Sequence, residues 1–176
     1  MNVTVSDVKK VCIKDVKSLD TINVFLEDFR PGVGRIIIEV FGSSWASSWT
    51  GMGDGNDMAT FFCSCHPQYL IGKLAPQLES RVPATTGMVA HLKQRICERR
   101  REGCISAKTA REWYGMSERE PDDGDSRYFG EVSTFPICDL LGDEWWYDLP
   151  MESNYKYDYL KRIVETVQEA LLKETT

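Results

Sequence analysis

The side chains most suited to chemistry stand in one short stretch that holds two thiols and an imidazole. Cys63, Cys65 and His66 are residue types that zinc accepts as ligands. Structural zinc sites usually hold two pairs of ligands, each pair separated by two or more residues; here one residue separates the cysteines, and no second compact pair follows. We therefore expect reduced structural thiols and no bound metal, and we rank a zinc protein or enzyme centred on these residues third among the hypotheses.

A glycine-rich loop over residues 51–57 invites comparison with phosphate-binding loops. It lacks the Gly-Lys-Ser/Thr ending of a P-loop and the glycine pattern of dinucleotide-binding folds. It also lacks the ligand spacing of an EF-hand. We interpret it as a tight connection without a ligand, and the sequence indicates no cofactor.

Acid–base chemistry has few candidates, because His66 and His91 are the only histidines. Nucleophilic catalysis needs a nucleophile, a base and an orienting group assembled in space. No spacing in the chain indicates such an assembly. We therefore predict no catalytic residue, and no sequence motif supports an enzymatic function.

Basic residues gather on two predicted helices between residues 88 and 115, where they could meet phosphates. We favour a solvated helix surface as the explanation, partly because an acidic stretch follows, and nucleic-acid binding is the second functional hypothesis. The residues concerned are Lys93, Arg95, Arg99, Arg100, Arg101, Lys108 and Arg111.

The segment from residue 139 to residue 159 combines carboxylates with aromatic side chains, a mixture that suits a protein interface. The alternative is that Trp145 and Trp146 divide, one in the core and one on the surface. We predict that the partner-binding residues are Asp139, Asp143, Glu144, Trp145, Trp146, Tyr147 and Tyr155.

The net charge of −6 hides a strong segregation along the chain. Residues 1–80 carry −2, residues 81–117 carry +5, residues 118–158 carry −9 and the rest are neutral. The acidic stretch, which includes Asp122, Asp123, Asp125 and Glu131, either neutralises the basic helices or presents a separate anionic face.

The composition of the 176 residues, 42% hydrophobic and 27% charged, is that of an ordinary globular protein. No apolar run approaches the length of a membrane span, and the N-terminus lacks the pattern of a signal peptide. We expect a cytoplasmic protein without a membrane partner, whose six cysteines are reduced.

The elements that must position these residues indicate one α+β domain over residues 1–176. An N-terminal antiparallel sheet of three to four strands precedes packed helices. Alternating apolar residues predict paired strands over residues 22–29 and 35–41, joined by Pro31 and Gly32, with further strands near 11–16 and 42–49. The last of these strands places Trp45 and Trp49 on one face.

The remainder of the chain has mostly helical signals. We expect short helices over residues 58–62, capped by Asn56 or Asp57, and 69–74, then a helix over 88–101 and one capped by Ser106. Residues 118–150 form an acidic irregular segment. The final helix, over residues 153–173, has the clearest 3.6-residue period, with Gln168 on its polar face.

Segments 26–29, 36–39, 49–53, 61–65 and 154–160, together with Pro31-Gly32, Phe41-Gly42, Trp45, Ile163 and Val167, resemble a known group. These are small accessory proteins, described as hypothetical, of tailed phages and prophages of enterobacteria and their relatives. The resemblance covers about half of the chain. It implies expression in an infected or lysogenic bacterium and carries over no catalytic residue.

The leading hypothesis is a phage-encoded, non-enzymatic interaction protein. It binds a host or phage macromolecule, most simply a protein, and modulates it in host takeover or counter-defence. This hypothesis rests on the resemblance, on the segregation of charge along the chain and on the lack of a recognisable set of catalytic residues. The sequence leaves the oligomeric state open.

Overall fold

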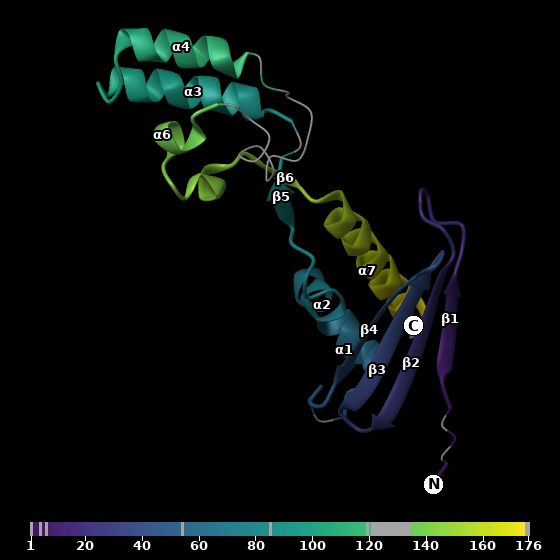
Figure 1. Ribbon diagram of the computed structural model, residues 1–176. Coiled ribbons are helices and arrows are strands. Elements are labelled where there is room, and N and C mark those ends of the chain that lie inside the picture. Colours follow the sequence, from purple (N-terminus) through teal and green to yellow (C-terminus); the bar gives the residue numbers. More distant parts are fainter. Residues whose placement is uncertain are drawn as a thin grey trace. The chain divides into compact units, whose positions relative to one another are not determined.

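The computed structural model describes residues 2–3, 5, 7–53, 55–84, 86–118, 120 and 135–174 (Figure 1). The chain forms two compact units: unit 1 comprises residues 1–80 and 155–176, and unit 2 comprises residues 81–154. The predicted α+β class is confirmed. Whether the two units unfold together, as the single predicted domain requires, stays a prediction.

Unit 1 begins with a four-stranded antiparallel sheet in the order β1-β2-β3-β4. The strands are β1 (Lys9–Ile13), β2 (Ile22–Arg30), β3 (Val33–Val40) and β4 (Ser43–Trp49). Ile22 lies opposite Val40 and Leu26 opposite Ile36, so the predicted β2–β3 hairpin is confirmed. The first strand starts earlier than expected and ends before Val16.

Two tight turns set the register of this sheet. Gly32 has a φ of +74°, and a Cβ there would lie 3.0 Å from the Gly53 carbonyl oxygen. Phe41 and Gly42 join β3 to β4 with φ values of 33° and 80°. Positive φ at both central residues is the type I′ turn, whose twist matches that of two paired strands.

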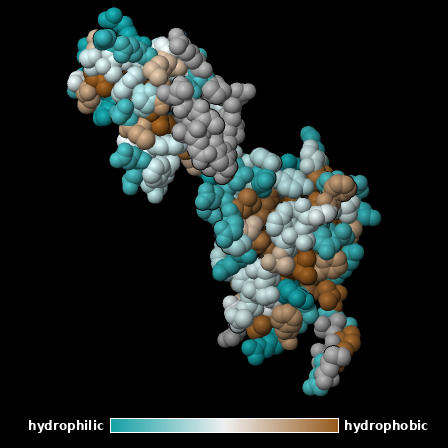
Figure 2. All heavy atoms as spheres, in the orientation of Figure 1, coloured by the Kyte–Doolittle hydropathy of each residue, from teal (hydrophilic) through white to brown (hydrophobic). Residues whose placement is uncertain are grey.

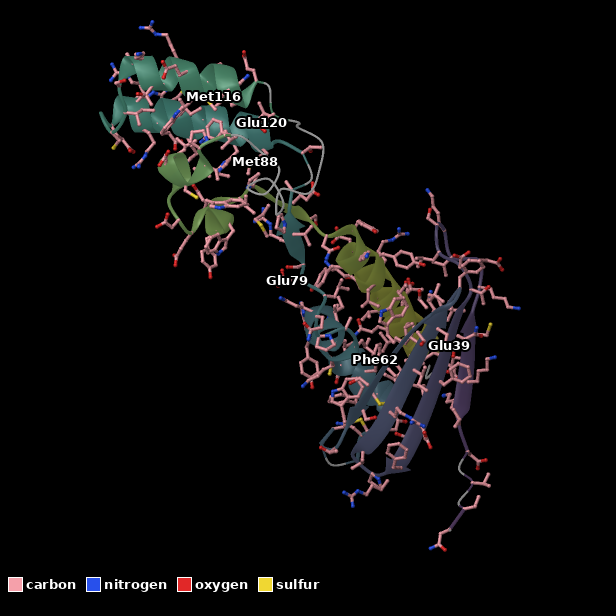
Figure 3. All side chains as sticks on the ribbon, in the orientation of Figure 1. Glu39, Phe62, Glu79, Met88, Met116 and Glu120 are labelled. Carbon is pink, nitrogen blue, oxygen red and sulfur yellow. The ribbon has the colours of Figure 1, made fainter. Side chains whose placement is uncertain are left out.

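One face of the sheet is covered by three helices: α1 (Met58–Ser64), α2 (Pro67–Leu74) and α7 (Tyr155–Glu174). Alternate residues of β2 and β3 are buried beneath them, as the period of two predicts. Phe62 of α1 is fully buried between the layers, whereas Glu39 of β3 is exposed (Figure 3). The hydrophobic core of unit 1 therefore lies between the sheet and these helices.

The C-terminal helix completes this core with the buried residues Leu160, Ile163, Val164, Val167 and Leu171. The predicted helix and its apolar face are confirmed. One residue of the expected polar face has another role. The Gln168 side chain donates hydrogen bonds to the carbonyl oxygens of Phe62 (2.9 Å) and Cys65 (2.7 Å), and so joins α7 to the end of α1.

The glycine-rich loop is tied to the β2–β3 hairpin. The Met52 amide donates to the Gly32 carbonyl at 2.8 Å, and the Gly32 amide donates to the Asn56 carbonyl at 3.2 Å. The Asn56 side chain in turn donates to the Met52 carbonyl at 2.8 Å. These bonds give Met52 and Asn56 a structural role at the two sides of the loop.

Unit 2 begins and ends with a short ribbon, in which β5 (Arg81–Pro83) pairs antiparallel with β6 (Met151–Ser153). Between them lie α3 (Met88–Arg101) and α4 (Ala107–Ser117), which match the predicted helices. The Ser106 hydroxyl accepts a hydrogen bond from the Thr109 amide at 3.0 Å, so that cap is confirmed.

The segment expected to be irregular contains two short helices where it is described. These are α6 (Ile137–Leu141) and the 3₁₀ helix η2 (Trp145–Asp148). Both pack against α3, and Met88 and Met116 belong to the same apolar cluster (Figure 3). The acidic residues Asp122, Asp123, Asp125 and Glu131 lie outside the described residues. Within the described part, no helix is both long and apolar enough to cross a bilayer.

Candidate functional site

The two thiols and the imidazole serve as structural groups at the joint of α1 and α2. The Cys63 thiol donates to the Gln168 carbonyl oxygen at a sulfur–oxygen distance of 3.6 Å. His66 is the N-cap of α2, and its Nδ1 accepts a hydrogen bond from the Gln68 amide at 3.2 Å. Among the residues that the structure describes, no three His, Cys, Asp or Glu side chains are grouped as metal ligands would be.

The electrostatics of these thiols disfavour the ionised form that binds metals. Burial raises the pKa of the Cys63 thiol, and the nearby Asp57 carboxylate raises it further. Burial also raises the pKa of the Cys65 thiol. Because zinc binds the thiolate, both shifts oppose a zinc site here. The absence of bound metal nevertheless stays a prediction for elemental analysis.

The basic residues of α3 and α4 divide into a paired and an unpaired group. Lys93 Nζ lies 3.1 Å from a Glu118 oxygen. Arg95 contacts Glu98 at 2.9 Å and Asp148 at 3.0 Å. Lys108 lies near Glu112 at 3.9 Å. These three cations are partly neutralised within unit 2 and have less charge to offer a ligand.

Three of the four residues without an ion pair to a described residue line a groove of about 450 Å³ between α3 and α4, which we call the arginine groove, whereas the fourth, Arg99, does not line it. Arg100, Arg101 and Arg111 surround a partly apolar floor, and no ion pair joins them to any other described residue. In Figure 2, the surface of these helices mixes hydrophilic side chains with intermediate and some hydrophobic ones. The lining residues are Ile96, Cys97, Arg100, Arg101, Ala107, Ala110, Arg111 and Tyr114.

The predicted partner residues on α6 and η2 are held in place by the core of unit 2. Ile137 and Leu140 of α6 are buried against α3, and Gly142, with a φ of 94°, ends that helix. Asp148 then fixes η2 to α3, because its carboxylate lies 3.0 Å from Arg95 Nε. Packing of α6 and η2 against a core favours a preorganised interface.

Trp145 and Trp146 differ in burial, as the alternative interpretation predicts: one packs on the core and the other lies on the surface. Trp145 is half-buried against the apolar cluster, whereas Trp146 is 50% exposed and Tyr147 is 80% exposed. The ring centroids are 6.2 Å apart for Trp145 and Trp146 and 5.9 Å apart for Trp146 and Tyr147. The exposed rings are therefore steadied by a ring that is anchored in the core.

Three exposed carboxylates accompany these rings: Asp139, Asp143 and Glu144. None of them has an ion pair with another residue in the described part of the chain. We call Asp139, Asp143, Glu144, Trp146 and Tyr147 the acidic–aromatic surface. Tyr155, which the sequence groups with them, belongs to unit 1.

Tyr155 contributes to a feature that the sequence does not reveal, a groove of about 900 Å³ in unit 1. This edge groove is formed by the start of β4, the segment after α2 and the first two turns of α7. Its lining is mostly apolar and includes Trp45, Leu78, Tyr155 and Tyr159. Three segments far apart in the sequence meet there, so no local pattern could have indicated it.

Comparisons with known proteins give one match. The model of a phage family matches residues 1–173, nearly the whole chain. No curated protein and no solved structure matches the chain.

Proposed function

Because the chain belongs to the phage family Phage_phiTE_072, we propose that it is a phage-encoded, non-enzymatic interaction protein that binds a host or phage protein and modulates its activity. The observation that carries the proposal is the acidic–aromatic surface. Large exposed rings on a rigid support, with unpaired carboxylates beside them, are the composition of a binding site rather than of an ordinary solvated surface.

The chemistry of this surface defines the partner. Asp139, Asp143 and Glu144 favour a partner with a basic patch, because complementary charge steers the two proteins together. Trp146 and Tyr147 supply the apolar area that excludes water at the centre of an interface. We therefore propose that the partner presents lysines or arginines around an apolar pocket.

The test is co-purification with the tagged full chain from infected or lysogenic cells, followed by binding kinetics with the captured partner. Trp146→Ala removes a central ring, and such a truncation typically lowers affinity by about thirtyfold, or about 2 kcal/mol. The double variant Asp143→Asn with Glu144→Gln should mainly slow association, because rim charges act on the encounter rate.

Two matched variants separate this surface from general effects. Leu172→Ala truncates another exposed apolar side chain, 54% exposed, on α7 of unit 1. Asp7→Asn with Asp20→Asn removes the same charge from exposed positions of unit 1. Both controls should bind like the parent. If folded Trp146→Ala and the carboxylate variant also bind like the parent, the acidic–aromatic surface is not the interface.

A second function, nucleic-acid binding, is favoured by one observation in the arginine groove. Arg100, Arg101 and Arg111 converge there without ion pairs to other described residues, and Tyr114 offers a ring on which a base can stack. Single-stranded nucleic acid fits this combination better than duplex, because its bases are accessible for stacking.

Anisotropy of labelled single- and double-stranded oligonucleotides over a salt series tests this function. Binding through the groove should weaken steeply with salt, and the triple change of Arg100, Arg101 and Arg111 to Ala should weaken it further and flatten the salt dependence. The matched control is Lys173→Ala, since Lys173 is paired with Glu169 on α7 and belongs to unit 1. No binding at low salt would remove the hypothesis.

The biological setting is also part of the proposal. We propose that the protein is an accessory protein of tailed phages of enterobacteria and their relatives. It would act in the cytoplasm of the infected or lysogenic cell, in host takeover or counter-defence. The supporting fact is membership of the phage family, together with the resemblance of the segments around Pro31, Trp45 and residues 154–160.

A further inference from the structure

The β4 strand is an edge strand whose outer side is unoccupied among the described residues. It pairs with β3 alone, at the end of the sheet order. Its sequence, Ser-Ser-Trp-Ala-Ser-Ser-Trp, has no charged residue and no proline. The opposite edge, β1, carries Lys9 and Lys10, and lysines at an edge discourage further pairing. Only the β4 edge therefore lacks such protection.

The turn before β4 determines which backbone groups face outward. In a hairpin with a two-residue type I′ turn, the residues flanking the turn, here Val40 and Ser43, exchange both hydrogen bonds. The pattern then alternates, so Trp45 and Ser47 bond to β3, while Ser44, Ala46 and Ser48 direct their N–H and C=O groups away from it. These three residues are exposed, and no backbone bond from them to another described residue exists outside the sheet.

The edge groove lies beside this row of free donors and acceptors. Ser43 and Trp45 line it from β4, and their side chains are on the face of the sheet that the helices cover. A residue placed directly opposite Trp45 on an added strand would have its side chain on that same face. It would therefore enter the groove and meet Trp45, Tyr155 and Tyr159.

We propose that the β4 edge and the edge groove together bind an extended peptide segment of a partner protein, which adds a fifth strand to the sheet and inserts one large apolar side chain. Main-chain hydrogen bonds to Ser44, Ala46 and Ser48 would hold the peptide, and the groove would select its sequence. This site lies in unit 1 and is separate from the two surfaces of unit 2 discussed above.

A second copy of the chain is a poorer occupant than a free peptide. In such a dimer, the added strand would be β4 of the second copy. The large side chains of β4 already pack in the core of their own unit. Trp49 is buried and Trp45 is half-buried against the core of its own unit. Such a dimer would have no large side chain from β4 to place in the groove, whereas a peptide has a free side chain at every second position.

The charge on the rim adds one requirement on the peptide. Lys156 and Arg162 of α7 line the groove with two positive charges, and Asp158 supplies one negative charge. The Arg162 guanidinium donates to the Lys17 carbonyl oxygen at 3.1 Å, so it keeps its full charge while its position is fixed. The complementary peptide has a carboxylate next to its apolar anchor.

The experiment is selection of a displayed library of random linear peptides against the folded full-length chain, followed by anisotropy with the selected peptide. The selected sequences should share one large apolar residue, β-branched residues in alternation and a nearby Asp or Glu. In the bound state, the amides of Ser44, Ala46 and Ser48 should gain protection from hydrogen exchange. The amides of Trp45 and Ser47 should not change, because they already bond to β3.

Variants on both sides test the hydrogen-bond pattern. Ala46→Pro removes one outward N–H and keeps the bonds to β3, and it should weaken binding at least about tenfold. A peptide that is N-methylated at every second amide should not bind when the methylated amides are those that face β4. It should bind normally when the methylated amides are those that face away. This result does not depend on how well Ala46→Pro folds. Tyr155→Ala, at a position 74% exposed, should weaken binding, whereas its control Leu172→Ala should not.

Several results would overturn the proposal. One is a selection that enriches no peptide family, and another is a family that binds Ala46→Pro and Tyr155→Ala as tightly as the parent. A third is binding that tolerates methylation of either set of alternate peptide amides, which would mean that the groove takes an isolated side chain or small molecule. A dimer that Ala46→Pro converts to monomer, with no peptide bound, would make a second copy the occupant.

Discussion

Replacing Gln168 with Ala should destabilise the protein more than its place on the polar face of the last helix suggests. The Gln168 amide nitrogen donates to the carbonyl oxygens of Phe62 and Cys65. These carbonyls stand at the C-terminus of α1, where the last turn of a helix has no partners of its own. Gln168→Ala therefore removes a joint between α1 and α7. It takes this donor from the Cys65 carbonyl and leaves the Phe62 carbonyl with only the Cys65 amide, at 3.4 Å.

The magnitude follows from those two bonds. A side-chain hydrogen bond contributes about 1 kcal/mol net, and a buried acceptor left unpaired costs about 1–3 kcal/mol. Both carbonyls keep some access to water, because the bonds are partly buried rather than enclosed. We therefore expect a loss of about 2–3 kcal/mol, which for a chain of this size lowers Tm by about 4–12 °C.

Urea unfolding followed by tryptophan fluorescence and circular dichroism measures this loss as a lower midpoint at unchanged slope. Gln168→Met is the matched variant, because it keeps the length and most of the packing but has no donor. It should lose nearly as much as Gln168→Ala. If Gln168→Met is as stable as the parent, packing rather than hydrogen bonding accounts for the effect, and the reasoning is wrong.

Three further predictions concern unit 1 and the thiols. Hydrogen bonds from Thr60, chiefly from its backbone amide, hold the pKa of Asp57 below its usual value. The contribution of Asp57 to the free energy of unfolding is therefore present above the unfolded-state pKa and disappears as the pH falls through the folded-state pKa. Asp57→Asn should make the stability measured in urea less sensitive to acid. Elemental analysis of protein purified without chelator should find no stoichiometric zinc, and about one metal per chain that is lost in Cys63→Ser would contradict this. Replacing residues 81–154 with a short Gly-Ser linker should leave unit 1 folded, because Arg81 lies opposite Ser153 and the two cut ends are neighbours. If circular dichroism shows that the shortened chain is unfolded, the protein is one cooperative domain instead.

The elements that the sequence could predict are those whose signals are local. Ile22, Val24 and Leu26 alternate within one strand, and the Pro31-Gly32 turn fixes their partner a few residues later. By contrast, β5 and β6 are three residues each and pair over a long separation, so neither has a pattern of its own. The α6 helix has five residues, too few for a 3.6-residue period to emerge.

The candidate surfaces were predictable in composition but not in arrangement. The sequence places Arg95 and Arg111 in one basic group, and only the fold separates the ion-paired Arg95 from the unpaired Arg111. It also groups Tyr155 with Trp146, although the two residues belong to different units. Charge is a property of residue type, whereas pairing is a property of distance, and the latter requires the tertiary structure.

The position of α7 in unit 1 has a consequence for synthesis on the ribosome. The sheet is complete by Trp49, and α1 and α2 follow it directly, yet its apolar face is fully covered only when the last helix, Tyr155–Glu174, has been made. Residues 81–154 are contiguous and are complete before α7 is made, so unit 2 can fold while the core of unit 1 still lacks its last helix. At roughly 5–20 residues per second, this core stays incomplete for several seconds. During that time part of its apolar surface is accessible, and we expect the unit that begins second to be the first to finish folding.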